Sequence, residues 1–207
     1  TLASCTGYLP GGIAWYRKHF EVKDNAKRHY IYFEGVYNRS EVYLNGQLLG
    51  KRPNGYVSFM YDLTPYLKEG ENVLAVRVDH SRYADSRWYT GSGIYRDVWM
   101  ISSGDTHFAQ WGIGWHATSI TKNQATVAVD VEIEKHTSDA EKLEVRATLI
   151  DADGKAVANR RMAVGKAEQG LTKKSLSLKV SKPKRWSLET PYLYTLKTEV
   201  WTDDKLV

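Results

Sequence analysis

The fold class follows from Val127–Glu134, which reads Val-Ala-Val-Asp-Val-Glu-Ile-Glu. Apolar and polar residues alternate here, apart from Ala128 on the polar side. Successive side chains of a β-strand point to opposite faces, so this pattern predicts a strand with one buried and one solvated face. Such alternation is typical of antiparallel sheets. Residues 127–134 are therefore expected to form an antiparallel strand of a β-sandwich.

The same pattern recurs through the second half of the chain. Alternating apolar residues predict further strands at Leu143–Leu149, Leu176–Val180 and Leu193–Trp201, and Asp153-Gly154 marks a hairpin turn between strands. Short strands at this spacing favour a compact, immunoglobulin-like sandwich built on Val and Leu.

The first half is richer in aromatic residues and less regular, and it is also expected to be a β-sandwich. Asn45-Gly46 is the strongest hairpin signal in the chain, because both residues tolerate the positive φ of a tight turn. Strands are expected at four places: Arg28–Val36, Glu41–Gly50 around that turn, Val73–Val78 and Arg96–Ile101.

One short helical turn should interrupt these strands. Thr64 is placed to cap it, Pro65 suits its first position and Gly70 suits its exit.

A boundary is predicted at Ser102–Asp105, which gives domains 1–103 and 104–207. Each is large enough for a core of its own. The first is expected to lack part of its N-terminal side and the second part of its C-terminal side, because both ends enter or leave strand patterns abruptly. The sequence is thus expected to be a piece of a longer protein.

Composition and charge exclude several function classes. The 29 basic and 24 acidic residues give a net charge of +5, and the densest basic cluster is only Lys182–Arg185. Nucleic-acid binding needs a contiguous basic face, so no nucleic-acid partner is expected. No apolar run approaches the length of a membrane span, so no membrane partner is expected either. The single cysteine, Cys5, excludes an internal disulfide framework.

The residues offer no recognisable catalytic or metal centre. Glycoside hydrolysis needs two carboxylates across a cleft, whereas most acidic residues here fall on polar faces of strands, as Glu132 and Glu144 do. The six histidines form no close ligand pair along the sequence, and no nucleophile elbow or phosphate-binding loop occurs. We expect no catalytic residue, metal or cofactor in this chain.

The most distinctive stretch is Ser86–Trp99, which reads Ser-Arg-Trp-Tyr-Thr-Gly-Ser-Gly-Ile-Tyr-Arg-Asp-Val-Trp. Aromatic faces and a bidentate donor beside a glycine turn suit a sugar. The alternatives are that Trp88 and Tyr89 pack under a loop and that Arg87 forms a surface ion pair with Asp85. Five other tryptophans are assigned to cores or domain contacts: Trp15, Trp99, Trp111, Trp115 and Trp186.

Taken together, the motifs resemble the N-terminal half of glycoside hydrolase family 2 enzymes, particularly β-galactosidases. The resemblance extends over nearly the whole chain and keeps one order. Its motifs are Ala14–Phe20, Val42–Gly50, Gly55–Thr64, Asn72–Val78, Arg87–Val98 and Trp186–Tyr194.

The resemblance implies a jelly-roll sugar-binding domain followed by an immunoglobulin-like domain. In the family a (β/α)₈ barrel follows and carries two glutamates that perform retaining hydrolysis through a glycosyl-enzyme intermediate. The chain is thus expected to be an inactive part of a glycosidase, a β-galactosidase by preference, that supports the barrel and shapes its cleft. The implied partners are a β-galactoside or related glycan and the barrel itself. A homo-oligomer stays open, as does localisation, for which an extracytoplasmic place is the favoured expectation.

The resemblance also implies substrate-binding residues. In the family, the loop before the Gly-Ile-Tyr-Arg motif reaches the rim of the active site, so Arg87, Trp88 and Asp85 are expected to shape the substrate pocket. Some β-galactosidases carry an aspartate where this chain has Arg87. Two other functions remain open: a stand-alone carbohydrate-binding module, and a purely structural or oligomerisation spacer.

Overall fold

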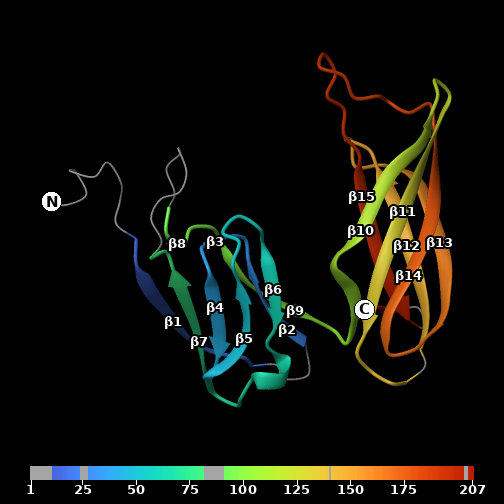
Figure 1. The fold of residues 1–207 in the computed structure, drawn as a ribbon. Coiled ribbons are helices and arrows are strands. Elements are labelled where there is room, and N and C mark those ends of the chain that lie inside the picture. Colours follow the sequence, from blue (N-terminus) through green and yellow to red (C-terminus); the bar gives the residue numbers. More distant parts are fainter. Residues whose placement is uncertain (1–10, 24–27, 82–90, 140, 203–204) are drawn as a thin grey trace. The chain divides into compact units, whose positions relative to one another are not determined.

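A computed structural model describes residues 11–23, 28–81, 91–139, 141–202 and 205–207 (Figure 1). Almost all regular structure in these ranges is antiparallel strand, which confirms the all-β fold class. The chain divides into two compact units between Ser103 and Gly104, called unit 1 and unit 2 here. No helix in the described ranges has the length and hydropathy that crossing a bilayer would require.

Unit 1 contains two main sheets and a short ribbon (Figure 1). The first sheet has the order β1(Ile13–Glu21), β7(Glu71–Asp79), β4(Ser40–Leu44) and β5(Gln47–Arg52). The second has the order β6(Phe59–Asp62), β2(Arg28–Phe33) and β9(Val98–Ser103). The ribbon pairs β3(Val36–Tyr37) with β8(Gly93–Ile94).

The predicted hairpin of unit 1 is confirmed. Strands β4 and β5 are joined by Asn45 and Gly46, with φ of 51° and 86°. The Asn45 side chain also ties the turn to β7, because its Oδ1 accepts a hydrogen bond from the Val73 amide at 3.0 Å. The turn is therefore stabilised by the backbone preferences of Asn45 and Gly46 and by a hydrogen bond to β7.

The core of unit 1 lies between its sheets. Phe33 and Phe59 are almost fully buried, and their rings stack with centroids 5.0 Å apart. Leu74, Val76 and Val78 are buried on one face of β7, as the alternation predicts. The same core includes Val36, Val42, Leu44 and Leu63.

The helical turn is present, but its predicted cap is wrong. It is a 3-10 turn, η1(Thr64–Tyr66), preceded by Leu63. Thr64 lies inside the turn, where its own amide donates to Asp62 Oδ1 at 2.8 Å and its hydroxyl accepts from the His29 amide at 3.0 Å. The N-cap position is Leu63, whose side chain cannot cap, and the Asp62 carboxylate forms an Asx-turn with the amide two residues on.

Unit 2 is a sandwich of two sheets (Figure 1). One has the order β10(Thr106–Ile120), β11(Gln124–Lys135) and β14(Gly170–Ser181). The other has the order β13(Ala156–Ala167), β12(Glu141–Ile150), β15(Thr195–Thr202) and β16(Lys205–Leu206). This is the strand order of an immunoglobulin-like domain.

The alternating residues of unit 2 form its core. Val129, Val131 and Ile133 of β11 face Leu143, Val145 and Ala147 of β12, and all are nearly fully buried. The hairpin at Asp153-Gly154 is also confirmed, with a Gly154 φ of 80° and a hydrogen bond from its amide to Asp151 O.

Of the two places expected for five tryptophans, the core is wrong, and domain contacts stay a prediction. Trp15, Trp99, Trp111, Trp115 and Trp186 are all exposed. Smaller branched residues and phenylalanines fill both cores instead. Exposed large aromatics on a soluble domain mark surfaces that contact something else.

Candidate functional site

The expected substrate-binding residues Asp85, Arg87 and Trp88 lie outside the described residues. The structure describes the two chain segments that flank residues 82–90. These are the end of β7 with Asp79–Ser81, and Gly91–Ile94 leading into β8. We call these flanking segments the loop stem.

Asp79 ties the first side of the loop stem to two arginines. Its Oδ1 accepts hydrogen bonds from Arg39 Nη2 at 3.0 Å and from both the amide and the hydroxyl of Ser81, and its Oδ2 accepts from Arg77 Nη2 at 3.1 Å. These bonds, that from the Ser81 hydroxyl foremost, hold the pKa of Asp79 well below its usual range. The carboxylate stays ionised at any ordinary pH and fixes where the chain leaves β7.

His80 holds the two sides of the stem together. Its Nδ1 lies 2.6 Å from the Ser92 hydroxyl, and its ring packs edge-on against Tyr37, with centroids 4.9 Å apart. His80 is 8% exposed, so this bridge is screened from water. The two ends of the intervening segment are thereby joined by a buried polar contact.

Gly93 is required at the second side of the stem. It has a φ of 89° and pairs with Tyr37 in the β3–β8 ribbon. A Cβ on Gly93 would lie 2.0 Å from the hydroxyl oxygen of Tyr16. Both the backbone angle and the close approach of Tyr16 therefore demand glycine at this position.

The described carboxyl groups do not include a prepared general acid. Hydrogen bonds lower the pKa of four carboxyl groups below its usual value. These groups are Glu41, Asp79, Asp139 and Glu189. A general acid near neutral pH needs a raised pKa.

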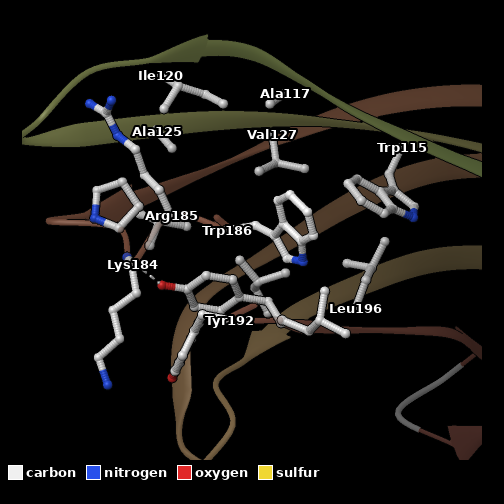
Figure 2. A pocket seen from close by; sticks show the side chains of 15 residues that line it. Trp115, Ala117, Ile120, Ala125, Val127, Lys184, Arg185, Trp186, Tyr192 and Leu196 are labelled. Carbon is white, nitrogen blue, oxygen red and sulfur yellow. Dashed lines mark hydrogen bonds between the residues drawn. The ribbon is translucent and has the colours of Figure 1, made fainter. Parts of the chain in front are cut away.

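A second feature is an apolar groove of about 670 Å³ in unit 2 (Figure 2). Its floor consists of core side chains from both sheets, including Val127 and Leu149. Its walls are residues of β10 and of the segment 183–194. Figure 2 shows the indole rings of Trp115 and Trp186 over the same hollow.

The wall segment is held by its own polar contacts. The Ser187 and Thr190 hydroxyls close a turn at 3.0 Å, and the Tyr194 hydroxyl accepts from the Lys184 amide at 2.9 Å. The Tyr192 hydroxyl accepts from the Ala152 amide at 3.1 Å. Both tyrosine hydroxyls are thus engaged with backbone, so the groove offers a mainly apolar surface.

A third feature, missed by the sequence reasoning, is a cluster of possible metal ligands. His107, Glu134 and His136 lie with one ligand atom each within 4.8 Å of one another. The pair His107 and His136 is distant in sequence, and antiparallel pairing of β10 with β11 brings it together. The sequence signal for this cluster is the spacing of Glu134 and His136. Two residues apart in an extended chain, their side chains point to the same side.

Comparisons with known proteins place these features in context. Residues 6–103 match the model described as glycosyl hydrolases family 2, sugar binding domain, and residues 106–207 match the model described as glycosyl hydrolases family 2. The chain is 45% identical to β-galactosidase BoGH2A of Bacteroides ovatus, over 96% of this chain and 24% of that protein. It is 28% identical to a β-glucuronidase of Formosa agariphila, over 95% of this chain and 22% of that protein.

Solved structures agree with the sequence matches. A glycosyl hydrolase family 2 member from Bacteroides cellulosilyticus superposes with a TM-score of 0.91 at 31% identity, covering 97% of this chain and 28% of that one. The chain therefore spans about a quarter of the length of the relatives that it matches.

Proposed function

Because the chain belongs to glycosyl hydrolase family 2, we propose that it forms the non-catalytic domains that support the catalytic part of a β-galactosidase and shape its substrate cleft. The carrying observation is the match to BoGH2A, which covers nearly all of this chain and about a quarter of that enzyme. The bond-breaking carboxylates of the whole protein lie outside this chain and act by retaining hydrolysis.

The apolar groove of unit 2 supports the scaffolding part of this proposal. Trp186 and Leu193 line the groove and are 57% and 70% exposed, although core side chains form its floor. A sugar site needs several convergent polar groups, whereas this groove offers mostly aliphatic and indole surface. The groove suits an apolar segment from the remaining three quarters of the protein.

The loop stem supports the cleft-shaping part. Arg87, Trp88 and Asp85 are proposed as substrate contacts at the rim of the cleft. Asp79, His80 and Gly93 fix both ends of the segment that carries them. A binding loop with anchored ends loses less conformational entropy when a ligand binds.

The whole protein tests the proposed activity. We expect it to hydrolyse a chromogenic β-D-galactoside and the 207-residue chain alone to be inactive. Arg87→Ala in the whole protein should lower kcat/KM, whereas Arg161→Ala, at an exposed position of β13 that pairs with Arg146, should leave it unchanged. Turnover by the isolated chain, or equal effects of the two variants, would contradict the proposal.

The relatives also favour one alternative substrate. A β-glucuronidase relative matches the same span, and a glucuronide carries a carboxylate that arginine binds well. Parallel assays with a β-D-galactoside and a β-D-glucuronide decide between them. A whole protein that prefers the glucuronide would replace the galactosidase proposal and keep the scaffolding role.

A stand-alone carbohydrate-binding role is tested on the chain itself. Titration with galactose and oligosaccharides, followed by calorimetry, should give no binding. Millimolar or tighter binding that is lost in Trp88→Ala or Trp186→Ala would favour a binding module instead. If Arg87→Ala leaves kcat/KM of the whole protein unchanged, a structural or oligomerisation spacer becomes the better description.

A further inference from the structure

His107, Glu134 and His136 form a compact cluster on two paired strands. His107 on β10 and Glu134 on β11 are direct register partners, and His136 follows Glu134 by two residues. Glu134 Oε2 lies 3.6 Å from His107 Nε2 and 3.5 Å from His136 Nε2. The imidazole rings lie nearly parallel, with centroids 5.4 Å apart. One carboxylate oxygen is thus shared between two imidazole nitrogens.

The backbone sets the tautomer of His107. Its Nδ1 lies 3.0 Å from the carbonyl oxygen of Gly104. A carbonyl only accepts hydrogen bonds, so Nδ1 carries the proton and Nε2 of the neutral ring carries the lone pair. A histidine that ligates a metal usually donates its other ring N–H to such a carbonyl, which orients the ring and raises its basicity.

The arrangement calls for positive charge at its centre. Nε2 of His107 and the carboxylate oxygen of Glu134 are both electron-pair donors. A cation bound between them would be attracted to both. Partial burial strengthens the effect, since the three side chains are between one sixth and about one third exposed.

We propose that His107, Glu134 and His136 bind a divalent transition-metal ion, of which Zn²⁺ is the best match. Two imidazoles and one carboxylate are a ligand set typical of Zn²⁺, with a water in the fourth position. Bonds of about 2.0 Å in a tetrahedron place neighbouring ligand atoms about 3.3 Å apart. The two distances to Glu134 are already close to that value, and all three ligand atoms lie within 4.8 Å of one another. Ca²⁺ and Mg²⁺ require oxygen ligands and do not match.

The ion would link the first residues of β10 to the last residues of β11. His136 is already tied to the entry of β10, because its amide donates to Asp105 O at 2.9 Å. Lys135, the last residue of β11, stands between Glu134 and His136 in the sequence, faces the other way and is buried among carbonyls of residues 137 and 139. A metal here would therefore stabilise unit 2 at the start of its first strand, β10, independently of any activity of the whole protein.

Zinc competition on the untagged, EDTA-stripped chain tests the proposal. A chromogenic chelator should report one tightly bound Zn²⁺ per chain, and the melting temperature should rise with Zn²⁺ concentration. Loss of a second-shell partner alone weakens metal sites about 10–100-fold, so His107→Gln and His136→Gln should each weaken binding at least that much. His116→Gln, an exposed histidine on the same strand, is the matched control and should bind as wild type.

Imidazole ¹⁵N spectra keep the test valid if a variant misfolds. In the wild-type chain, Zn²⁺ should shift the Nε2 signals of His107 and His136 and leave His116 unchanged, while His107 Nδ1 stays protonated. The proposal is overturned if these signals do not move with Zn²⁺, or if His107→Gln and His116→Gln bind equally well. In that case the cluster is a set of hydrogen-bonding side chains that holds no metal ion.

Discussion

Arg39 and Asp79 meet at the point where the chain leaves β7 for the proposed substrate loop. Arg39 Nη2 donates to Asp79 Oδ1 at 3.0 Å, and the Asp79 amide donates to the carbonyl of Asn38, the neighbour of Arg39, at 3.1 Å. The same two segments are thus joined by a side-chain ion pair and a backbone bond. The first side of the loop stem has a fixed position because an ion pair and a backbone hydrogen bond join the same two segments.

Asp79→Asn should destabilise unit 1 at neutral pH. The folded-state pKa of Asp79 is lowered, so its contribution to stability is present above the unfolded pKa of about 3.9. That contribution is lost progressively as the pH falls from roughly 5 toward the folded pKa. Urea unfolding at pH 7 and pH 3 should therefore show a difference between wild type and variant that shrinks in acid. Glu168→Gln, at an exposed site, should show little change at either pH.

Gly93→Ala should strain the second side of the stem. The residue has a φ of 89°, and the added Cβ meets the Tyr16 hydroxyl. We expect a loss of about 1–3 kcal/mol in unfolding free energy. Gly91→Ala, where a Cβ meets nothing within 4 Å, is the control and should be nearly neutral. Adding Tyr16→Phe to Gly93→Ala should recover part of the loss, and no recovery would show that the clash is unimportant.

Lys135→Met should destabilise unit 2. The Lys135 side chain is 1% exposed. Its ammonium donates to Thr137 O at 2.8 Å and to Thr137 Oγ1 at 2.7 Å. It also donates to the backbone carbonyl and to the Oδ1 atom of Asp139. Methionine keeps the aliphatic stem and removes these bonds, which should cost about 2–3 kcal/mol by chemical denaturation. Lys173→Met, an exposed pair with Glu132, is the control. Equal effects would mean that the buried bonds contribute little.

Phe33→Ala should destabilise the chain itself, whereas Trp186→Ala should affect its contact with the rest of the whole protein. Phe33 is fully buried and stacks on Phe59, so its loss should cost about 3–5 kcal/mol in the chain alone. Trp186 is exposed, so its loss should cost less than about 1 kcal/mol there. In the whole protein, Trp186→Ala should lower the melting temperature of the catalytic part. If it does not, the groove is not a contact surface for that part.

The sequence predicted most strands because alternation is a local property. Val127, Val129, Val131 and Ile133 fall on one face of a strand whatever the rest of the chain does, and Asn45-Gly46 forms its turn by its own backbone preference. The helical turn at Thr64 was also recognised, although its cap was not. The N-cap position falls at Leu63, and the Thr64 hydroxyl instead accepts a hydrogen bond from the amide of His29, which is distant in sequence.

The candidate sites depend on more distant neighbours. The sequence around Trp186 does not distinguish an exposed indole from a buried one. Exposure depends on whether other elements cover the indole in the folded domain. The sequence by itself determined that both halves are antiparallel β-structure, since period-two alternation and turn residues act over a few neighbouring positions. Only the tertiary structure decided that Asp79 meets Arg39 and that His107 meets Glu134 and His136. Strand register sets those encounters, and register is a property of the assembled sheet.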